Sequence, residues 1–357
     1  MKIIKRIIAT SLALCAAISM TACGNTKWVF DYSGKQITSG MYIAKQMQFF
    51  NEMQTHKDYK QKAKLQDQKL DGKSASDFIY SKVKDDCDKF MAIENEFEKL
   101  GLKLEEKDTN IIDQRVKSGW QQMGAIYTKN CVNENTFAKI MTNGYKRDMV
   151  FNKYYDKGGI QEVKTADLTA HFKLNFAVAN IKGISLEVPE AGKELTAEQK
   201  TANTKTKENI AKMLNSINKE KKSFNEASIA FDKANKKPDE ELKDETVKPD
   251  DETRSVLKKG AKNPSEKVEN AIFNDAKQGG EAIMIEDTNG VYIVKRIEIE
   301  KATKNFDEMR SQLIYDLKSA DFDAKMLEWA KAAPAPKINN NSVKRYKIEK
   351  IDFAQEE

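Results

Sequence analysis

The clearest β-sheet signal in the sequence lies in residues 282–299, which read AIMIEDTNGVYIVKRIEI. Two apolar runs, Ala282–Glu286 and Val291–Ile299, flank the dipeptide Asn289-Gly290. Asn-Gly is strongly favoured in two-residue hairpin turns, because both of its residues tolerate a positive φ. The stretch therefore predicts two antiparallel strands that are joined by a tight turn.

A region of mixed strands and helices is predicted upstream of this hairpin. Phe176–Leu186 is an apolar run of strand length, and apolar residues then recur at helical spacing over 210–217. A shorter helix is expected at 223–231 and another at 264–276. The order of elements is then strand, three helices, strand, turn and strand.

Two strongly polar segments interrupt these patterns. Residues 232–253 contain nine acidic and five basic residues, a composition that predicts an exposed or disordered loop. Residues 51–74 are rich in lysine and glutamine, and they are predicted to form either a long exposed helix or a mobile insertion.

Long helical segments flank the mixed region on both sides. Apolar stripes at helical spacing predict helices at about 76–100, 105–126 and 133–156, and a final helix or helix pair at about 306–331. The second helix is expected to break near Gly119 and Gly124. A strand pair that turns at Ser33-Gly34 is predicted near the start of the chain, and a last strand is predicted at Val343–Ile351.

The N-terminus has the order of features that marks a secretory signal. Basic residues precede a mostly apolar run, Ile7–Met20, and Thr21-Ala22-Cys23 follows it. A cysteine directly after small residues is typical of a bacterial lipobox, in which a lipid is attached to the new N-terminal thiol. We expect removal of residues 1–22 and lipid on Cys23, palmitate included, as the anchor to the extracytoplasmic face of the cell membrane. The alternative is an ordinary secretory signal with a chance cysteine.

Composition and motifs narrow the function classes. The net charge of +6 falls to +3 once the three basic residues of the signal are removed, which gives no reason to expect nucleic acid as a partner. Cys87 and Cys131 would either form a disulfide or remain thiols, and the sequence leaves both open. His56 and His171 are too far apart to supply a common zinc site, so no metal or cofactor is expected.

Four segments, in this order and behind a lipobox, resemble the SurA/PrsA-type foldases. They are Gly34–Tyr42, Lys222–Ser228, Val268–Phe273 and Gly290–Arg296. Members of this family are extracytoplasmic chaperones with a parvulin-like prolyl isomerase domain. The resemblance implies an α+β fold, in which a helical region, 23–165, packs with a C-terminal helix in 301–357. A parvulin-like domain, 166–300, is then inserted between them.

The resemblance also implies an apolar pocket with two buried histidines in the parvulin-like domain. Here Asn180 and Tyr292 stand at the two histidine positions, and Phe273 would line a residual pocket. We expect Asn180 and Tyr292 to hydrogen-bond to each other, as the histidines would. The replaced histidines predict a degenerate domain with weak or absent isomerase activity.

The leading prediction is a lipid-anchored foldase or holdase for unfolded or partly folded secreted proteins. One alternative is an active peptidyl-prolyl cis-trans isomerase, and a second is a solute-binding lipoprotein. Solute-binding proteins usually have two α/β lobes with repeated strand–helix units, whereas this sequence predicts one small strand set and long helices.

Overall fold

The computed structural model describes residues 27–190, 192–235, 247–250, 252–288, 290–299 and 303–353. The predicted signal peptide and Cys23 lie outside the described residues. The chain forms two compact units. The helical unit contains the residues up to Glu162 and those from Lys318 onward, and the sheet unit is Val163–Leu317. Helices and small antiparallel sheets together confirm the α+β prediction.

The helical unit contains a small sheet that joins the early and late parts of the chain. β1 (Trp28–Tyr32) and β2 (Lys35–Thr38) pair antiparallel across the predicted turn at Ser33-Gly34. β9 (Lys337–Ile338) adds to the other side of β1. The sheet order β2-β1-β9 therefore ties the C-terminal segment to the first strand of the unit.

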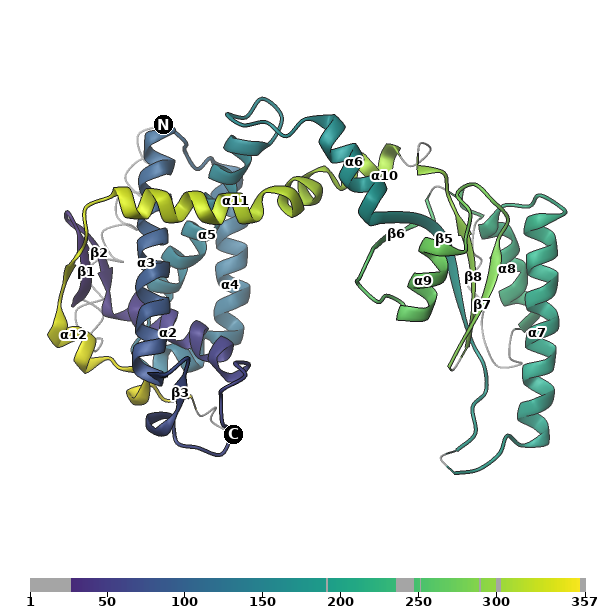
Figure 1. The fold of residues 1–357 in the computed structure, drawn as a ribbon, viewed down its shortest axis with the longest axis horizontal. Helices are drawn as coiled ribbons and strands as arrows, with labels where there is room; N and C mark the ends of the chain where they lie inside the picture. Colours follow the sequence, from purple (N-terminus) through teal and green to yellow (C-terminus); the bar gives the residue numbers. More distant parts are fainter. Residues whose placement is uncertain are drawn as a thin grey trace, which may run out of the picture. The chain divides into compact units, whose positions relative to one another are not determined.

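Long helices make up most of this unit (Figure 1). They are α2 (Ser39–Gln54), α3 (Ala75–Lys99), α4 (Glu106–Lys129) and α5 (Glu134–Tyr155). Thr38, Ser74 and Asn133 cap α2, α3 and α5 by accepting a backbone N–H with their side chains, which satisfies a donor that the first turn leaves open. The methionines of α2 lie in the core, with Met41 3% and Met53 0% exposed.

The predicted breaks near Gly119 and Gly124 are wrong, because α4 runs through both glycines. A Cβ at Gly119 would lie 2.7 Å from Cζ of Phe137 on α5, and one at Gly124 would lie 2.9 Å from Cε2 of Trp120. The glycines make room for aromatic rings on this helix and between α4 and α5. Their role is close packing, which outweighs their low helix propensity.

A C-terminal helix completes the helical unit. α11 (Arg310–Ala332) follows the short α10 (Thr303–Glu308), and its second part packs on α5 (Figure 1). Phe322 is fully buried, and its ring meets Phe151 and Tyr155 edge-on at centroid distances of 5.2 and 6.2 Å. The ring of Trp329 lies 5.5 Å from that of Tyr154.

Two predicted segments differ from the structure. Residues 55–74 form neither a long helix nor an open insertion, because the 3-10 turn Leu65–Asp67 and a hairpin of β3 (Lys69–Leu70) and β4 (Lys73–Ser74) follow α2. The predicted last strand, Val343–Ile351, is wrong. It is replaced by α12 (Asn340–Arg345) and the 3-10 turn Ile348–Lys350, whose Ile348 is fully buried.

The sheet unit is built on four antiparallel strands in the order β6-β5-β8-β7. They are β5 (Phe176–Ser185), β6 (Ser255–Lys258), β7 (Ile283–Asp287) and β8 (Gly290–Arg296). The hairpin of β7 and β8 confirms the prediction from residues 282–299. β6 was not predicted, because it is only four residues long and begins two residues after the acidic stretch.

Helices cover both faces of this sheet (Figure 1). α7 (Ala197–Asn218) and α8 (Phe224–Asn235) pack on the face that carries Ile184, Val291 and Ile293. α9 (Glu266–Asn274) packs on the opposite face, against Ala177, Ala179 and Val294. α6 (Thr165–Asn175) precedes β5, and its Phe172 meets Phe306 of α10 at 5.7 Å, so the unit runs on to Leu317, beyond the predicted residue 300.

Cys87 and Cys131 are not joined by a disulfide. Cys87 is fully buried in the core of the helical unit, and burial raises the pKa of its thiol. Within the described ranges, no helix combines the length and the apolar character that crossing a membrane requires.

Candidate functional site

Asn180 is a buried structural amide on β5. Its side chain is fully buried, and its Nδ2 donates to the backbone oxygen of Asp250 at 2.9 Å and to Oγ1 of Thr253 at 3.0 Å. The Nδ2 donors of this amide are thus directed at one turn of the protein, while its Oδ1 is buried without a hydrogen-bond partner among the described residues. That turn ends the acidic stretch 232–253, so the stretch is not one exposed loop.

The acidic stretch has structured ends. Its first residues, up to Asn235, complete α8, while residues 236–246 and Asp251 lie outside the described residues. The carboxylate of Asp250 accepts the backbone N–H groups of Phe224 and Asn225 at 3.0 and 3.1 Å. A carboxylate at a helix N-terminus satisfies open donors and favours the helix dipole. Asp250 thereby joins the start of α8 to Asn180.

Phe273 lies near the end of α9 and is partly buried. The guanidinium of Arg296 lies 5.7 Å from the centre of its ring. The same group donates to the carbonyl oxygens of Ile272 and Phe273, both at 3.2 Å, where the helix leaves its last acceptors open. Burial lowers the pKa of Arg296. Arg296 thus caps α9 from β8, a role that its distance in sequence hides.

Tyr292 lies on β8, opposite Gly183 of β5. It packs in the same apolar cluster as Phe273, on the α9 face of the sheet. Asn180 of β5 pairs in register with Lys295 of β8. Lys295 lies three residues, an odd number, after Tyr292 on the same strand. Because side chains alternate between the faces of a strand, Asn180 points to the α7–α8 face and Tyr292 to the α9 face. The expected hydrogen bond between Asn180 and Tyr292 is therefore not formed.

A groove in the helical unit gathers apolar and charged side chains. We call it the α3–α5 groove, because α3 and α5 form two of its walls, with β2 and the start of α2. Its volume is about 280 Å³. Its lining residues are Lys35, Gln36, Thr38, Met41, Phe90, Met91, Glu94, Lys139, Thr142 and Lys146. Met41, Phe90 and Met91 supply its apolar part.

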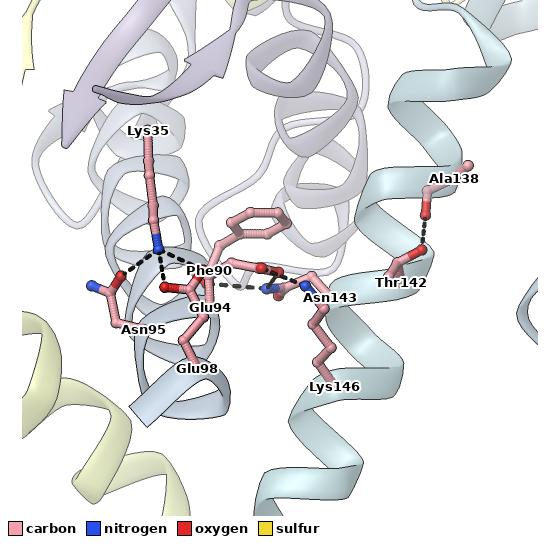
Figure 2. Close-up of polar contacts among 9 residues, drawn as sticks. All are labelled: Lys35, Phe90, Glu94, Asn95, Glu98, Ala138, Thr142, Asn143 and Lys146. Atoms are coloured by element: carbon pink, nitrogen blue, oxygen red, sulfur yellow. Dashed lines mark hydrogen bonds and ion pairs between the residues drawn. The ribbon is translucent and has the colours of Figure 1, made fainter. Parts of the chain in front are cut away.

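Ion pairs hold the charged rim of the groove (Figure 2). Lys35 of β2 donates to Asn95 at 3.1 Å and pairs with Glu98 at 2.7 Å, both on α3. Lys146 of α5 pairs with Glu94 of α3 at 2.6 Å, and both side chains are largely buried. These contacts join β2 and α5 to α3, and the Lys146–Glu94 pair is the less exposed of the two.

Buried polar bonds support the same wall. The Asn143 amide donates to the backbone oxygen of Phe90 at 3.0 Å and to Oε1 of Glu94 at 2.8 Å. The Thr142 hydroxyl donates a hydrogen bond to the carbonyl oxygen of Ala138 on the same helix, as Figure 2 shows. Glu94 is thus oriented by Lys146 and Asn143 together. The groove offers an apolar surface inside a fixed charged frame, an arrangement suited to binding.

Sequence reasoning did not identify this groove. Four elements line the groove, and its first and last lining residues, Lys35 and Lys146, are more than 100 residues apart in the sequence. The methionine-rich segment after Met41 was the one available signal, and most of its methionines pack in the core.

No protein-family model matches the sequence, and no curated protein matches it. Among solved structures, the chain is similar to foldase protein PrsA of Streptococcus pneumoniae, with 16% identity and a TM-score of 0.37 over 78% of this chain and 96% of that one. It is also similar to foldase protein PrsA of Lactococcus lactis, with 13% identity and a TM-score of 0.37 over 90% of this chain and 100% of that one. PrsA of Bacillus subtilis is 14% identical, with a TM-score of 0.27 over 94% of this chain and 96% of that one. Because these values are low, the function is inferred from the residues of this chain.

Proposed function

We propose that this chain is a chaperone of the foldase or holdase type, which binds unfolded or partly folded secreted proteins. Lipid on Cys23 would hold it at the extracytoplasmic face of the membrane. The α3–α5 groove is the observation that carries the proposal. The sequence resemblance to the SurA/PrsA-type foldases points to the same function.

The groove suits an extended polypeptide better than a compact ligand. Its volume of about 280 Å³ lies just below the usual range of small-molecule pockets, so it would take one or two apolar side chains at a time. Of the apolar lining residues, Phe90 is partly exposed, whereas Met41 and Met91 are only 3% and 5% exposed. Their flexible, polarisable side chains would repack when a client side chain enters. Lys139 is exposed at the rim and would attract acidic groups that flank an apolar client residue.

We further propose that prolyl isomerisation is weak or absent. An X–Pro bond crosses a barrier of about 18–20 kcal/mol, and a catalyst must direct its groups at one amide. Asn180 and Tyr292 belong to opposite faces of the sheet, and the Asn180 amide is engaged by Asp250 and Thr253. These groups are poorly placed to act on one substrate amide together.

An aggregation assay with groove variants tests the proposal. Residues 24–357 should slow the aggregation of an unfolded secreted protein. Thr142→Trp, which fills the groove, should remove most of this effect, and Lys139→Glu should weaken it by reversing a rim charge. Lys117→Glu changes an exposed lysine on α4, outside the groove, and should have no effect.

The outcomes separate the proposal from its alternatives. Equal suppression by Thr142→Trp and the unchanged protein would contradict binding in the groove. Absence of suppression by the unchanged protein would overturn the chaperone function itself. The same samples should not accelerate X–Pro isomerisation above the uncatalysed rate, and clear acceleration would favour the active isomerase.

A further inference from the structure

Three metal-ligating side chains converge in the helical unit, away from the α3–α5 groove. His56 and Asp58 lie in the loop after α2, and Asp71 lies in the turn between β3 and β4. One ligand atom from each of the three lies within 4.8 Å of the others. Nε2 of His56 is 3.4 Å from Oδ2 of Asp71, and Nδ1 of His56 is 3.9 Å from Oδ2 of Asp58.

The surrounding structure holds these side chains in place. The His56 ring packs edge-on against Phe78 at a centroid distance of 5.4 Å, and its side chain is 20% exposed. The backbone N–H of Asp71 donates to Oδ2 of Asp58 at 3.2 Å, which ties the two loop segments together. Gln68 is 1% exposed, and its amide bonds the backbone of Lys60 and Ala63. A ligand set that is ordered in advance loses less entropy on binding.

The charge of the cluster is uncompensated by the lysines around it. Residues 57–73 contain six lysines, yet within the described residues no ion pair joins a lysine or arginine to Asp58 or Asp71. Among the residues that the structure describes, His56 is the one basic side chain within ion-pair distance of either carboxylate. Two carboxylates beside an imidazole nitrogen are the donor set of a divalent ion rather than of an anion.

We propose that His56, Asp58 and Asp71 bind one divalent transition-metal ion, of the class of Mn²⁺ or Zn²⁺. Two ligand atoms at about 2.1 Å from a tetrahedral ion lie about 3.4 Å apart. This is the separation between Nε2 of His56 and Oδ2 of Asp71. The carboxylates are 42% and 59% exposed, so water completes the coordination.

Binding at Nε2 requires one proton shift within the imidazole. The N–H of Asp58 lies 3.2 Å from Nδ1 of His56, which accepts it and leaves the ring proton on Nε2. When the Nε2 lone pair binds the ion, that proton moves to Nδ1. The long hydrogen bond from the Asp58 N–H is given up, and the ion–ligand bonds replace it.

Titration with Mn²⁺, followed by its paramagnetic resonance signal, tests the site. Residues 24–357 retain every element that the structure describes, and they should bind one Mn²⁺ per chain. His56→Ala and Asp71→Asn should each weaken binding at least about tenfold, since even groups that only orient a ligand have effects of that size. Asp67→Asn removes an exposed carboxylate of the same loop and should leave the affinity unchanged.

Zn²⁺ provides a second probe, measured by calorimetry in a Cys131→Ser background so that this thiol does not compete. His171→Ala should leave Zn²⁺ binding intact, while Asp58→Asn, which keeps the His56 ring packing, should weaken it. Tryptophan fluorescence checks that each variant is folded. Absence of saturable binding of both ions, or binding that survives His56→Ala and Asp71→Asn unchanged, would overturn the proposal. Either result leaves the chaperone function untouched.

Discussion

Replacing Phe322 with alanine is expected to destabilise the helical unit by about 3–5 kcal/mol, the usual cost of truncating a buried phenylalanine. The Phe322 side chain is fully buried on α11, and its ring contacts Phe151, Tyr155 and Trp329 edge-on. Its removal leaves a cavity at the point where the C-terminal helix closes the unit. The measurement is denaturant unfolding followed by tryptophan fluorescence.

This probe reports on the helical unit alone, because Trp28, Trp120 and Trp329 are the chain's three tryptophans and all lie in that unit. Leu327→Ala on the same helix is the matched control. Leu327 is 37% exposed, so its truncation should lower the free energy of unfolding only slightly. Equal midpoints for the two variants would contradict the view that α11 is part of the helical core.

Asn180→Asp should destabilise the sheet unit by about 3 kcal/mol or more, because it buries a charge without an adequate partner. The substitution keeps the shape of the side chain, but it replaces a donor with an acceptor. The new carboxylate oxygen would face the backbone oxygen of Asp250, which now accepts from Nδ2 at 2.9 Å. The turn at Asp250–Thr253 and the start of α8 should loosen as a result.

Hydrogen exchange of β5, β6 and α8 measures this effect, since the sheet unit contains no tryptophan. Hydrogen exchange in these elements should become faster. The denaturant midpoint of the helical unit, followed by tryptophan fluorescence, should not change. Asn270→Asp introduces the same charge at an exposed position of α9 and should be nearly neutral. If Asn180→Asp matched this control, the buried amide would not be holding the turn.

The strongly periodic elements could be predicted from the sequence. The hairpin of β7 and β8 follows from two apolar runs around Asn289-Gly290, and the long apolar stripe of α3 places that helix to within one residue at each end. Such segments combine local propensity with a face to bury, so both signals agree. The α+β class follows from them.

Features that depend on contacts distant in sequence could not be predicted. Gly119 looks like a helix break until Phe137 is known to need the space beside it. Val343–Ile351 has apolar residues at strand-like positions, but there a short helix and a 3-10 turn bury Ile348 instead. Asp250 and Arg296 both cap helices from far along the chain, and neither has a local signal.

The candidate site was predicted less well than the fold. Asn180 and Tyr292 were assigned from a resemblance, but their relation depends on the register between β5 and β8, which apolar patterning leaves open. In the observed register, the two side chains fall on opposite faces. The α3–α5 groove had no motif at all, because it is assembled from four elements of ordinary composition.

Photo-cross-linking from the groove rim determines whether unfolded polypeptides bind there. A photoreactive residue at Gln36, which is exposed and lines the α3–α5 groove, should cross-link to an unfolded secreted protein, and the same residue at Lys117 on α4 should not. Adding Thr142→Trp should remove the cross-link at Gln36. Equal cross-linking at both positions, or none at Gln36 while aggregation is still suppressed, would contradict client binding in this groove.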